Sequence, residues 1–227
     1  MKERLANVLD RIHQAATACG RDPESIHLVA VSKTVPVDRV REAIDAGVKV
    51  LGENYVQEAQ EKIKTLSSYS VSWHFIGHLQ SNKAKYAVKL FHLIHSVDSV
   101  KLARELDKQS KKINKIQKIL IQVNVGEETS KSGAGPEDAQ RLIENVSHFK
   151  NLSIQGLMTM PPYFYEPERV RPFFIELRKL RDRIKNATIP NVVMDELSMG
   201  MTGDFEAAIQ EGATLVRIGT AIFGERQ

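Results

Sequence analysis

Short apolar runs alternate with helical patterns along almost the whole chain. Most of these runs are continuously apolar, which is typical of strands that are buried on both faces of a parallel sheet. Between them, apolar residues recur at the spacing of an amphipathic helix. The strands are predicted at Ile26–Ser32, Val48–Leu51, Ser72–Ile76, Leu93–Val97, Ile119–Val125, Ser153–Met158, Val192–Leu197 and Thr214–Ile218.

A helical pattern follows every predicted strand but the last. Gly47 and Gly212 come directly after two of the helices, in the position of a left-handed cap. This order predicts one (β/α)8 barrel domain over residues 1–227, with a doubly wound open sheet as the alternative. The proline-containing stretch 160–166 is expected to form a loop over the barrel mouth. The helices are predicted at Val37–Ala46, Asn54–Leu66, Ser81–Phe91, Val100–Ile113, Pro136–Phe149, Pro167–Lys185 and Asp204–Glu211.

The segment Met1–Gly20 predicts an additional helix before the first strand. Leu5, Val8, Ile12 and Ala16 have helical spacing, with charged residues between them. The segment lacks the unbroken apolar core of a signal peptide, and no run reaches the roughly 18 apolar residues of a membrane helix. We therefore expect a soluble protein.

Cysteine and charge exclude several classes of protein. Cys19 is the only cysteine, so one chain forms neither a disulfide nor a thiolate metal site, and a reducing cytoplasm is the expected location. The net charge is +4, and the densest basic patch, at 108–118, contains no interleaved aromatic residues. A solvated helix face explains this patch better than a nucleic-acid surface. His74 and His78 would lie on or just after a strand, where their spacing diverges, so no metal site is expected.

The residues that follow the strands meet at one end of a barrel. The active site of such barrels lies at the carboxyl ends of the strands, and phosphate groups favour the loops after the seventh and eighth. Lys33 closes the first strand there, and Asn54 follows the second. Ser198 and Thr220 supply hydroxyl donors after the seventh and eighth strands. Gly219, beside Thr220, lets backbone N–H groups approach an anion without a Cβ in the way.

Arg217 supports the prediction of an anion site at the barrel mouth. It shares a strand face with Gly219 and is therefore expected to point into the barrel, where a guanidinium needs a partner. A pyridoxal phosphate in this frame would meet Lys33 with its aldehyde and Ser198, Gly219 and Thr220 with its phosphate. Arg217 would lie near the pyridine nitrogen, where a positive charge disfavours protonation of the ring. Such a ring is a poor electron sink, so the site suits holding the cofactor better than demanding carbanion chemistry.

Ordered motifs over essentially the whole chain resemble the pyridoxal phosphate homeostasis protein family, whose members are relatives of the barrel domain of alanine racemase. This resemblance implies a fold type III pyridoxal phosphate barrel. The motifs are LVAVSKT around Lys33, LGENYVQE from Leu51, WHFIGHLQSNK from Trp73, HSVDS from His95, VNVGEETSKSG from Val123, GLMTM from Gly156 and ELSMGMTGDFEAAIQEGATLVRIGTAIFGER from Glu196.

The resemblance implies a role for the residues that hold the cofactor. Lys33 is implied to be the Schiff-base lysine, which forms the internal aldimine with the cofactor's aldehyde. Ser198, Gly219 and Thr220 are implied to hold the phosphate, with help from the backbone near Met199.

Further residues have implied or weaker roles around the ring. By the resemblance, Arg217 faces the pyridine nitrogen and Asn54 bounds the ring side of the pocket. His74 and Met158 are weaker candidates, and both also fit a place in the barrel core. Lys131 matches the family's pattern and could meet an anionic ligand, although solvation is the favoured explanation.

The implied function is that of a pyridoxal phosphate carrier with little or no catalysis. Such relatives are thought to buffer the cofactor and to hand it to apo-enzymes, and a monomer in the cytoplasm is expected. Alanine racemases add a second domain and a tyrosine base from a partner subunit, whereas this chain is expected to end after its barrel. Tyr163 and Tyr165 are the nearest candidates for such a base.

Two enzymes remain as alternatives to the carrier. One is an amino-acid racemase of the same fold. The other is a class I aldolase-like barrel, in which Lys33 attacks a sugar-phosphate carbonyl and no cofactor is present. Nucleic-acid binding is a third, less favoured reading.

Overall fold

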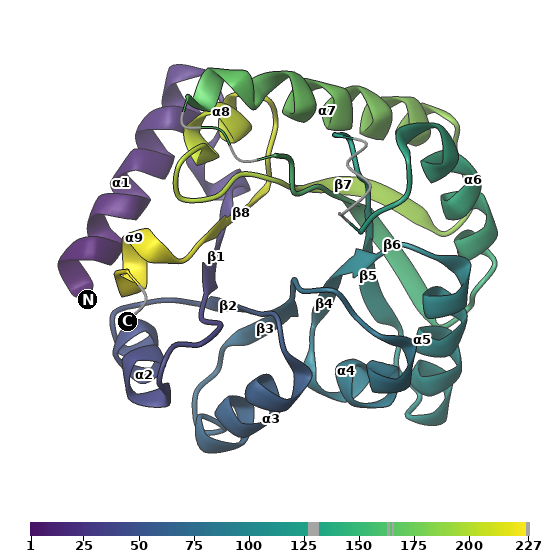
Figure 1. Cartoon of the computed structure of the whole chain (residues 1–227), viewed down its shortest axis with the longest axis horizontal. Coiled ribbons are helices and arrows are strands. Elements are labelled where there is room, and N and C mark those ends of the chain that lie inside the picture. The colour runs from purple at the N-terminus through teal and green to yellow at the C-terminus, as the bar shows by residue number, and fades with distance from the viewer. Residues whose placement is uncertain (127–131, 163, 165, 226–227) are drawn as a thin grey trace.

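The computed structural model describes residues 1–126, 132–162, 164 and 166–225. Within these residues, eight parallel strands form one closed barrel, in which β1 pairs with β2 on one side and with β8 on the other. Helices surround the barrel on its outside (Figure 1). The closed barrel confirms the (β/α)8 prediction and excludes the open sheet.

The eight predicted runs are all found as strands, in the predicted order. The bounds differ most at β5, which begins two and ends three residues earlier than predicted, and at β2, which begins and ends two residues later. Its last residue, Glu53, is fully buried although it is charged, because it pairs with a lysine of the next helix, as described below. The strands are β1 (His27–Val31), β2 (Val50–Glu53), β3 (Ser72–Phe75), β4 (Leu93–Val97), β5 (Gln117–Gln122), β6 (Leu152–Met158), β7 (Val192–Ser198) and β8 (Leu215–Ile218).

The predicted helices are all present, and some of them begin later than predicted. Asn54 was predicted to open a helix, but α3 starts at Val56 and leaves Asn54 in the loop. Ser81–Lys83 and Pro167–Arg169 form 3-10 turns, so α4 and α7 also begin later than predicted. The helices are α1 (Lys2–Ala18), α2 (Val37–Asp45), α3 (Val56–Thr65), α4 (Ala84–Leu90), α5 (Val100–Lys112), α6 (Pro136–Ser147), α7 (Arg171–Asn186), α8 (Phe205–Gln210) and α9 (Thr220–Phe223).

Two features of the helices agree with the expectations from sequence. Gly47 and Gly212 have φ angles of +115° and +98°, which favour glycine over any residue with a side chain. None of the helices in the described parts of the chain combines the length and the apolar character that a bilayer crossing requires.

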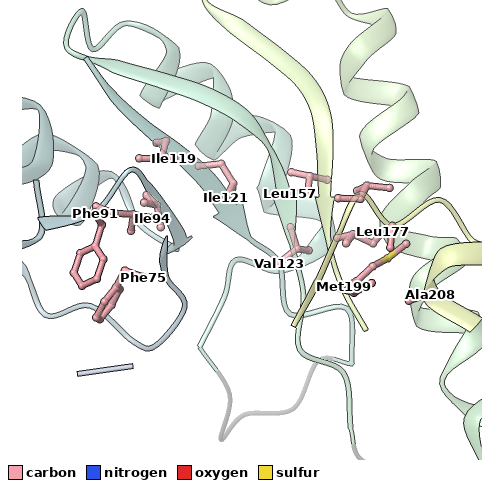
Figure 2. Packing of buried hydrophobic residues seen from close by; sticks show 14 of the residues in the cluster. Phe75, Phe91, Ile94, Ile119, Ile121, Val123, Leu157, Leu177, Met199 and Ala208 are labelled. Carbon is pink, nitrogen blue, oxygen red and sulfur yellow. The ribbon is translucent and has the colours of Figure 1, made fainter. Parts of the chain in front are cut away.

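The alternation of side chains along the strands divides the core into two layers. The inner layer fills the barrel and contains Val29, Leu93, Leu120, Met158 and Leu215. The outer layer packs between the strands and the helices. Figure 2 shows this outer packing, with Ile119 and Ile121 of β5 beside Leu157 of β6. Because successive strand residues face opposite sides, Leu120 points inward while its two neighbours point outward.

The N-terminal helix α1 joins the beginning of the chain to its last repeat. Arg11 donates from Nε to Glu206 Oε1 of α8 at 2.7 Å. Arg21, just after α1, donates to the carbonyl oxygens of Ile209 and Ala213 at 2.7 and 2.8 Å, at the end of α8. In Figure 1, α1 runs beside α8 and α9. The predicted additional helix is thus an integral part of the outer layer.

Candidate functional site

Lys33 lies two residues beyond the end of β1, at the mouth of the barrel, and is half-buried. Val31 pairs with Gly52 of β2, and the N–H of Ser32 donates to the Gly52 carbonyl oxygen at 3.0 Å. The paired residues end at Val31 and Gly52, and the chain then turns, with the Val35 N–H donating to the Ser32 carbonyl oxygen at 3.0 Å. The two residues predicted to meet the aldehyde and the ring, Lys33 and Asn54, thus follow the ends of neighbouring strands.

Asn54 presents an unsatisfied polar atom at this mouth. Its Oδ1 is buried and has no hydrogen-bond partner among the described residues. A buried acceptor without a donor costs free energy, so a donor on a bound molecule would be favourable there. The residue borders a hollow of about 200 Å³, which is lined by Asn54, Ile76, Gly77, His78, Gln122, Ser132 and Met160.

Gly219 connects the end of β8 to the end of β1. A Cβ added to Gly219 would lie 3.3 Å from the Val31 carbonyl oxygen and 3.4 Å from the Val31 Cβ, so the two strand ends approach closely. The next residue, Thr220, is exposed and opens α9. The predicted phosphate-binding turn therefore lies against the strand that carries Lys33.

Arg217 is a buried cation on the inner face of β8. It donates from Nη1 to Ser198 Oγ at 2.6 Å and from Nη2 to the Thr159 carbonyl oxygen at 2.8 Å. Burial lowers the pKa of Arg217 to about 10, and the charge of Asp204 opposes this effect. The guanidinium thus stays charged at neutral pH. Its position inside the barrel agrees with the expectation drawn from strand alternation.

Ser198 belongs to a chain of hydrogen bonds that crosses the barrel interior. Its Oγ lies 2.9 Å from His95 Nδ1, and His95 Nε2 lies 3.0 Å from His74 Nδ1. Burial lowers the pKa of His74 to about 3, with a smaller contribution from His92, and it lowers the pKa of His95 well below the ordinary value. Both imidazoles are therefore neutral. The Ser198 hydroxyl is engaged by Arg217 and His95, in a polar layer that joins β3, β4, β7 and β8.

Met199 contributes to the outer layer with its side chain. It is fully buried, and Figure 2 shows it near Leu177 of α7 and Ala208 of α8. Its N–H donates to the Leu215 carbonyl oxygen at 3.1 Å. The next residue, Gly200, has a φ of +88°, and a Cβ there would lie 2.6 Å from Ala208 Cβ. The turn after β7 thus needs glycine, and Met199 could serve a ligand only through this backbone turn.

The weaker candidates fall into two groups. Met158 belongs to the inner apolar cluster and His74 to the polar layer, so both lie in the barrel interior. Lys131, Tyr163 and Tyr165 lie outside the described residues. Across the part of the chain that the structure describes, no cluster of three His, Cys, Asp or Glu side chains could hold a metal ion.

Sequence reasoning did not connect His95 to Ser198, although His95 shares the inward face of β4 with Leu93 and this spacing could have revealed the polar layer. Thr159 contributes its backbone carbonyl oxygen, which no side-chain pattern reveals. The buried acid–lysine pair at β2 and α3 was also missed.

Comparison with known proteins places the chain in a family. Residues 4–227 match the family described as "Alanine racemase, N-terminal domain". The chain is 48% identical to the "Pyridoxal phosphate homeostasis protein" of Aquifex aeolicus over 225 residues, which cover 99% of this chain and 98% of the relative.

Solved structures agree with this relationship. PipY of Synechococcus elongatus, in a structure described as having PLP bound, has a TM-score of 0.85 and 35% identity, over 98% of this chain and 99% of PipY. An alanine racemase of Clostridium difficile has a TM-score of 0.74 and 15% identity, over 99% of this chain but only 57% of the racemase, and therefore shares the fold alone. The chain thus belongs to the alanine racemase N-terminal domain family and, within it, to the pyridoxal phosphate homeostasis proteins.

Proposed function

We propose that this protein binds pyridoxal 5'-phosphate at the barrel mouth and holds it covalently through Lys33, with little or no catalysis of its own. The observation that carries this proposal is the meeting of three strand ends. β1 pairs with β2 as far as Val31 and Gly52, shortly before Lys33 and Asn54, and Gly219 after β8 packs against Val31. A relative with PLP bound in its structure supports the same cofactor.

The residues at the mouth fit this cofactor. The Asn54 Oδ1, which has no partner among the residues that the structure describes, marks a place where a bound molecule would supply a donor. Gly219 has no Cβ, so its backbone and that of Thr220 can approach a phosphate closely. Arg217 provides a fixed positive charge inside the barrel. A phosphorylated aldehyde with a ring nitrogen matches this set of groups.

Each residue has a distinct task in the proposal. Ser198, Gly219 and Thr220 hold the phosphate, together with the turn after Met199. The Ser198 hydroxyl also accepts a hydrogen bond from Arg217 and so fixes the guanidinium. Asn54 bounds the ring. When bound, pyridoxal phosphate supplies an aldehyde, which the Lys33 amine converts to a C=N bond with loss of water.

Arg217 also argues for weak catalysis. A cation beside the ring nitrogen opposes protonation of that nitrogen, and carbanion chemistry relies on the protonated ring as an electron sink. Two hydrogen bonds hold the guanidinium, to Ser198 and to the Thr159 carbonyl oxygen. The site is thus suited to retaining an aldehyde.

Borohydride reduction of the protein loaded with pyridoxal phosphate tests the attachment. Because borohydride converts a C=N bond to a stable amine, we expect peptide mass mapping to find a pyridoxyl adduct on Lys33. Lys49, which is exposed just before β2, serves as an internal control and should stay unmodified at equimolar cofactor. Adducts on exposed lysines with none on Lys33 would disprove the assignment.

Racemisation of a single-enantiomer amino acid tests the catalytic claim. The loaded protein should leave L-alanine essentially unchanged over hours, because the buried cation disfavours the carbanion that racemisation requires. Chiral chromatography measures the enantiomer ratio. Inversion at roughly 1 s⁻¹ or faster, within the usual range of enzymes, would establish the racemase alternative instead.

We also propose a monomer that resides in the cytoplasm and hands its cofactor to apo-enzymes. The only cysteine, Cys19, supports a reducing compartment. Sedimentation of the purified chain tests the oligomeric state. Recovery of activity by a separate apo-enzyme, mixed with the loaded protein across a range of free cofactor, tests the transfer.

A further inference from the structure

A buried ammonium lies directly behind the loop that carries Lys33. Lys62 of α3 donates from Nζ to the Ser32 carbonyl oxygen at 2.5 Å, to Glu53 Oε1 at 2.9 Å and to Glu58 Oε1 at 2.6 Å. These bonds use all three donors of the ammonium. Ser32, Glu53, Glu58 and Lys62 are called the Lys62 cluster below.

The Lys62 cluster forms hydrogen bonds with the residues on both sides of Lys33. Before it, Ser32 is held twice, because its carbonyl oxygen accepts from Lys62 and its hydroxyl donates to Glu53 Oε1 at 2.6 Å. After it, the N–H of Thr34 donates to Glu58 Oε1 at 2.6 Å. Lys33 is thus the residue between two fixed points.

The backbone at Thr34 is held in an uncommon conformation. Its φ is +60°, in the left-handed region that a β-branched residue rarely adopts. Such a conformation is unfavourable and persists only where the surroundings determine it. The bond to Glu58 and a second bond, from the Thr34 hydroxyl to the Lys33 carbonyl oxygen at 2.6 Å, stabilise it. The strain therefore lies immediately beside Lys33.

Stability alone explains the Lys62 cluster poorly. The side chains of Glu53 and Lys62 are 0% and 7% exposed, and Glu53 Oε2 has no hydrogen-bond partner among the described residues. Burial raises the pKa of Glu53, although Lys62 opposes this effect, so the carboxylate is costly to keep charged. Apolar residues of similar volume often stabilise such a site equally well. A role in fixing the backbone around Lys33 accounts for the pair of Glu53 and Lys62 better.

We propose that the Lys62 cluster is a positioning device, which holds the loop 32–34 so that the Lys33 amine meets the cofactor's aldehyde. Ser32 lies between the end of β1 and Lys33, so its two bonds to the cluster fix the point from which Lys33 starts. Glu58, at the edge of the cluster, accepts from the Thr34 N–H and so fixes the backbone directly after Lys33. The inference rests on the proposed covalent attachment at Lys33.

Glu58→Ala is the variant that separates positioning from folding. Glu58→Ala removes the acceptor of both the Thr34 N–H and one Lys62 donor. Because Glu58 is 25% exposed and Thr34 is exposed, water can replace Glu58 at limited cost in stability. The buried pair of Glu53 and Lys62 remains in place. Glu58→Gln retains an acceptor for the Thr34 N–H and serves as the rescue variant. Glu61→Ala, on the exposed face of the same helix, removes the same charge and serves as the control.

Two measurements on each variant give the test. The first is the rate of covalent attachment of pyridoxal phosphate, followed by borohydride trapping at Lys33. The second is the affinity for pyridoxine 5'-phosphate, which fills the same pocket but has no aldehyde. In Glu58→Ala we expect attachment to slow about tenfold, since small misplacements of reacting groups carry rate costs of this order or larger. Affinity for the analogue should change less than about twofold, and Glu58→Gln should recover most of the rate.

The outcomes distinguish this inference from the proposed function. Attachment at the wild-type rate in Glu58→Ala would overturn the positioning role, and so would an equal loss of attachment rate and analogue affinity. If attachment in the control Glu61→Ala slows as much as in Glu58→Ala, the effect belongs to the charge of the helix, and the positioning role is also overturned. If the wild-type protein itself forms no adduct at Lys33, the proposed function fails instead.

Discussion

Lys33→Ala should abolish the covalent attachment of pyridoxal phosphate. The colour that accompanies a C=N bond to the cofactor should be absent, and borohydride reduction should leave no pyridoxyl adduct at position 33. The physical reason is that the proposed bond requires an unprotonated amine, which in this proposal only Lys33, after the end of β1, supplies. Lys33 is half-buried at a strand end, so the free energy of unfolding should fall by no more than about 1 kcal/mol.

Lys33→Arg separates the charge of the side chain from its chemistry. A guanidinium retains the positive charge that attracts the phosphate, but it does not form a stable C=N bond with an aldehyde. We therefore expect this variant to bind pyridoxine 5'-phosphate within about threefold of wild type, since the side chain keeps its positive charge. Absorbance titration and fluorescence of the analogue measure the two properties. Persistence of the coloured species in both variants would show that another lysine holds the cofactor.

The protein should lose stability steeply on mild acidification. His74 has a pKa of about 3 and the pKa of His95 lies well below the ordinary value, chiefly because burial disfavours the charged imidazole. The unfolded chain binds a proton at each histidine near pH 6.5, whereas the folded chain does not. As the pH falls below that value, each histidine lowers the free energy of unfolding by up to about 1.4 kcal/mol per pH unit, until the pH reaches its pKa in the folded chain.

Two carboxyl groups oppose part of this loss. Burial raises the pKa of Glu53 and of Asp204, so the folded state gains protons there as the pH falls toward the ordinary carboxyl pKa. The net slope should still be positive with pH, because the histidines begin to act near pH 6.5. Urea unfolding at a series of pH values measures it.

A matched pair of variants assigns the slope to the polar layer. His95→Gln should reduce the dependence on pH by about half, whatever its effect on absolute stability, because one titrating group is removed. His148→Gln, at an exposed position, should leave the slope unchanged. A free energy of unfolding that is constant from neutral pH to about pH 5 would contradict the assignment of neutral, buried imidazoles.

The order of the strands could be predicted because each is marked by a continuous apolar run. Leu93–Val97 was predicted with both boundaries correct. The end of β2 could not be predicted, because Gly52 and Glu53 carry no apolar signal and Glu53 is buried only through a contact with α3. Such a contact depends on how helix and strand are brought together, which a local pattern does not contain.

In the candidate site, too, some features could be predicted from the sequence and others could not. The positions of Lys33 and Asn54 follow from the rule that strand ends meet at one end of a barrel, and the register between β1 and β2 agrees with it. The partner of Arg217 at Thr159 is a backbone atom, and its partner Ser198 is also bonded to His95 on a strand across the barrel. Hydrogen bonds of this kind are determined by three-dimensional packing.

The pairing of β1 with β8 has a consequence for how the protein is made. Lys33 and Gly219 come from opposite ends of the chain, and their strands become neighbours only when the barrel closes. Synthesis releases β1 first and β8 last, so a growing chain carries the lysine long before it carries the turn that would hold a phosphate. Contacts between distant segments also form late in folding. The proposed pyridoxal phosphate site therefore forms only when the barrel has closed, and a chain truncated before β8 would lack it.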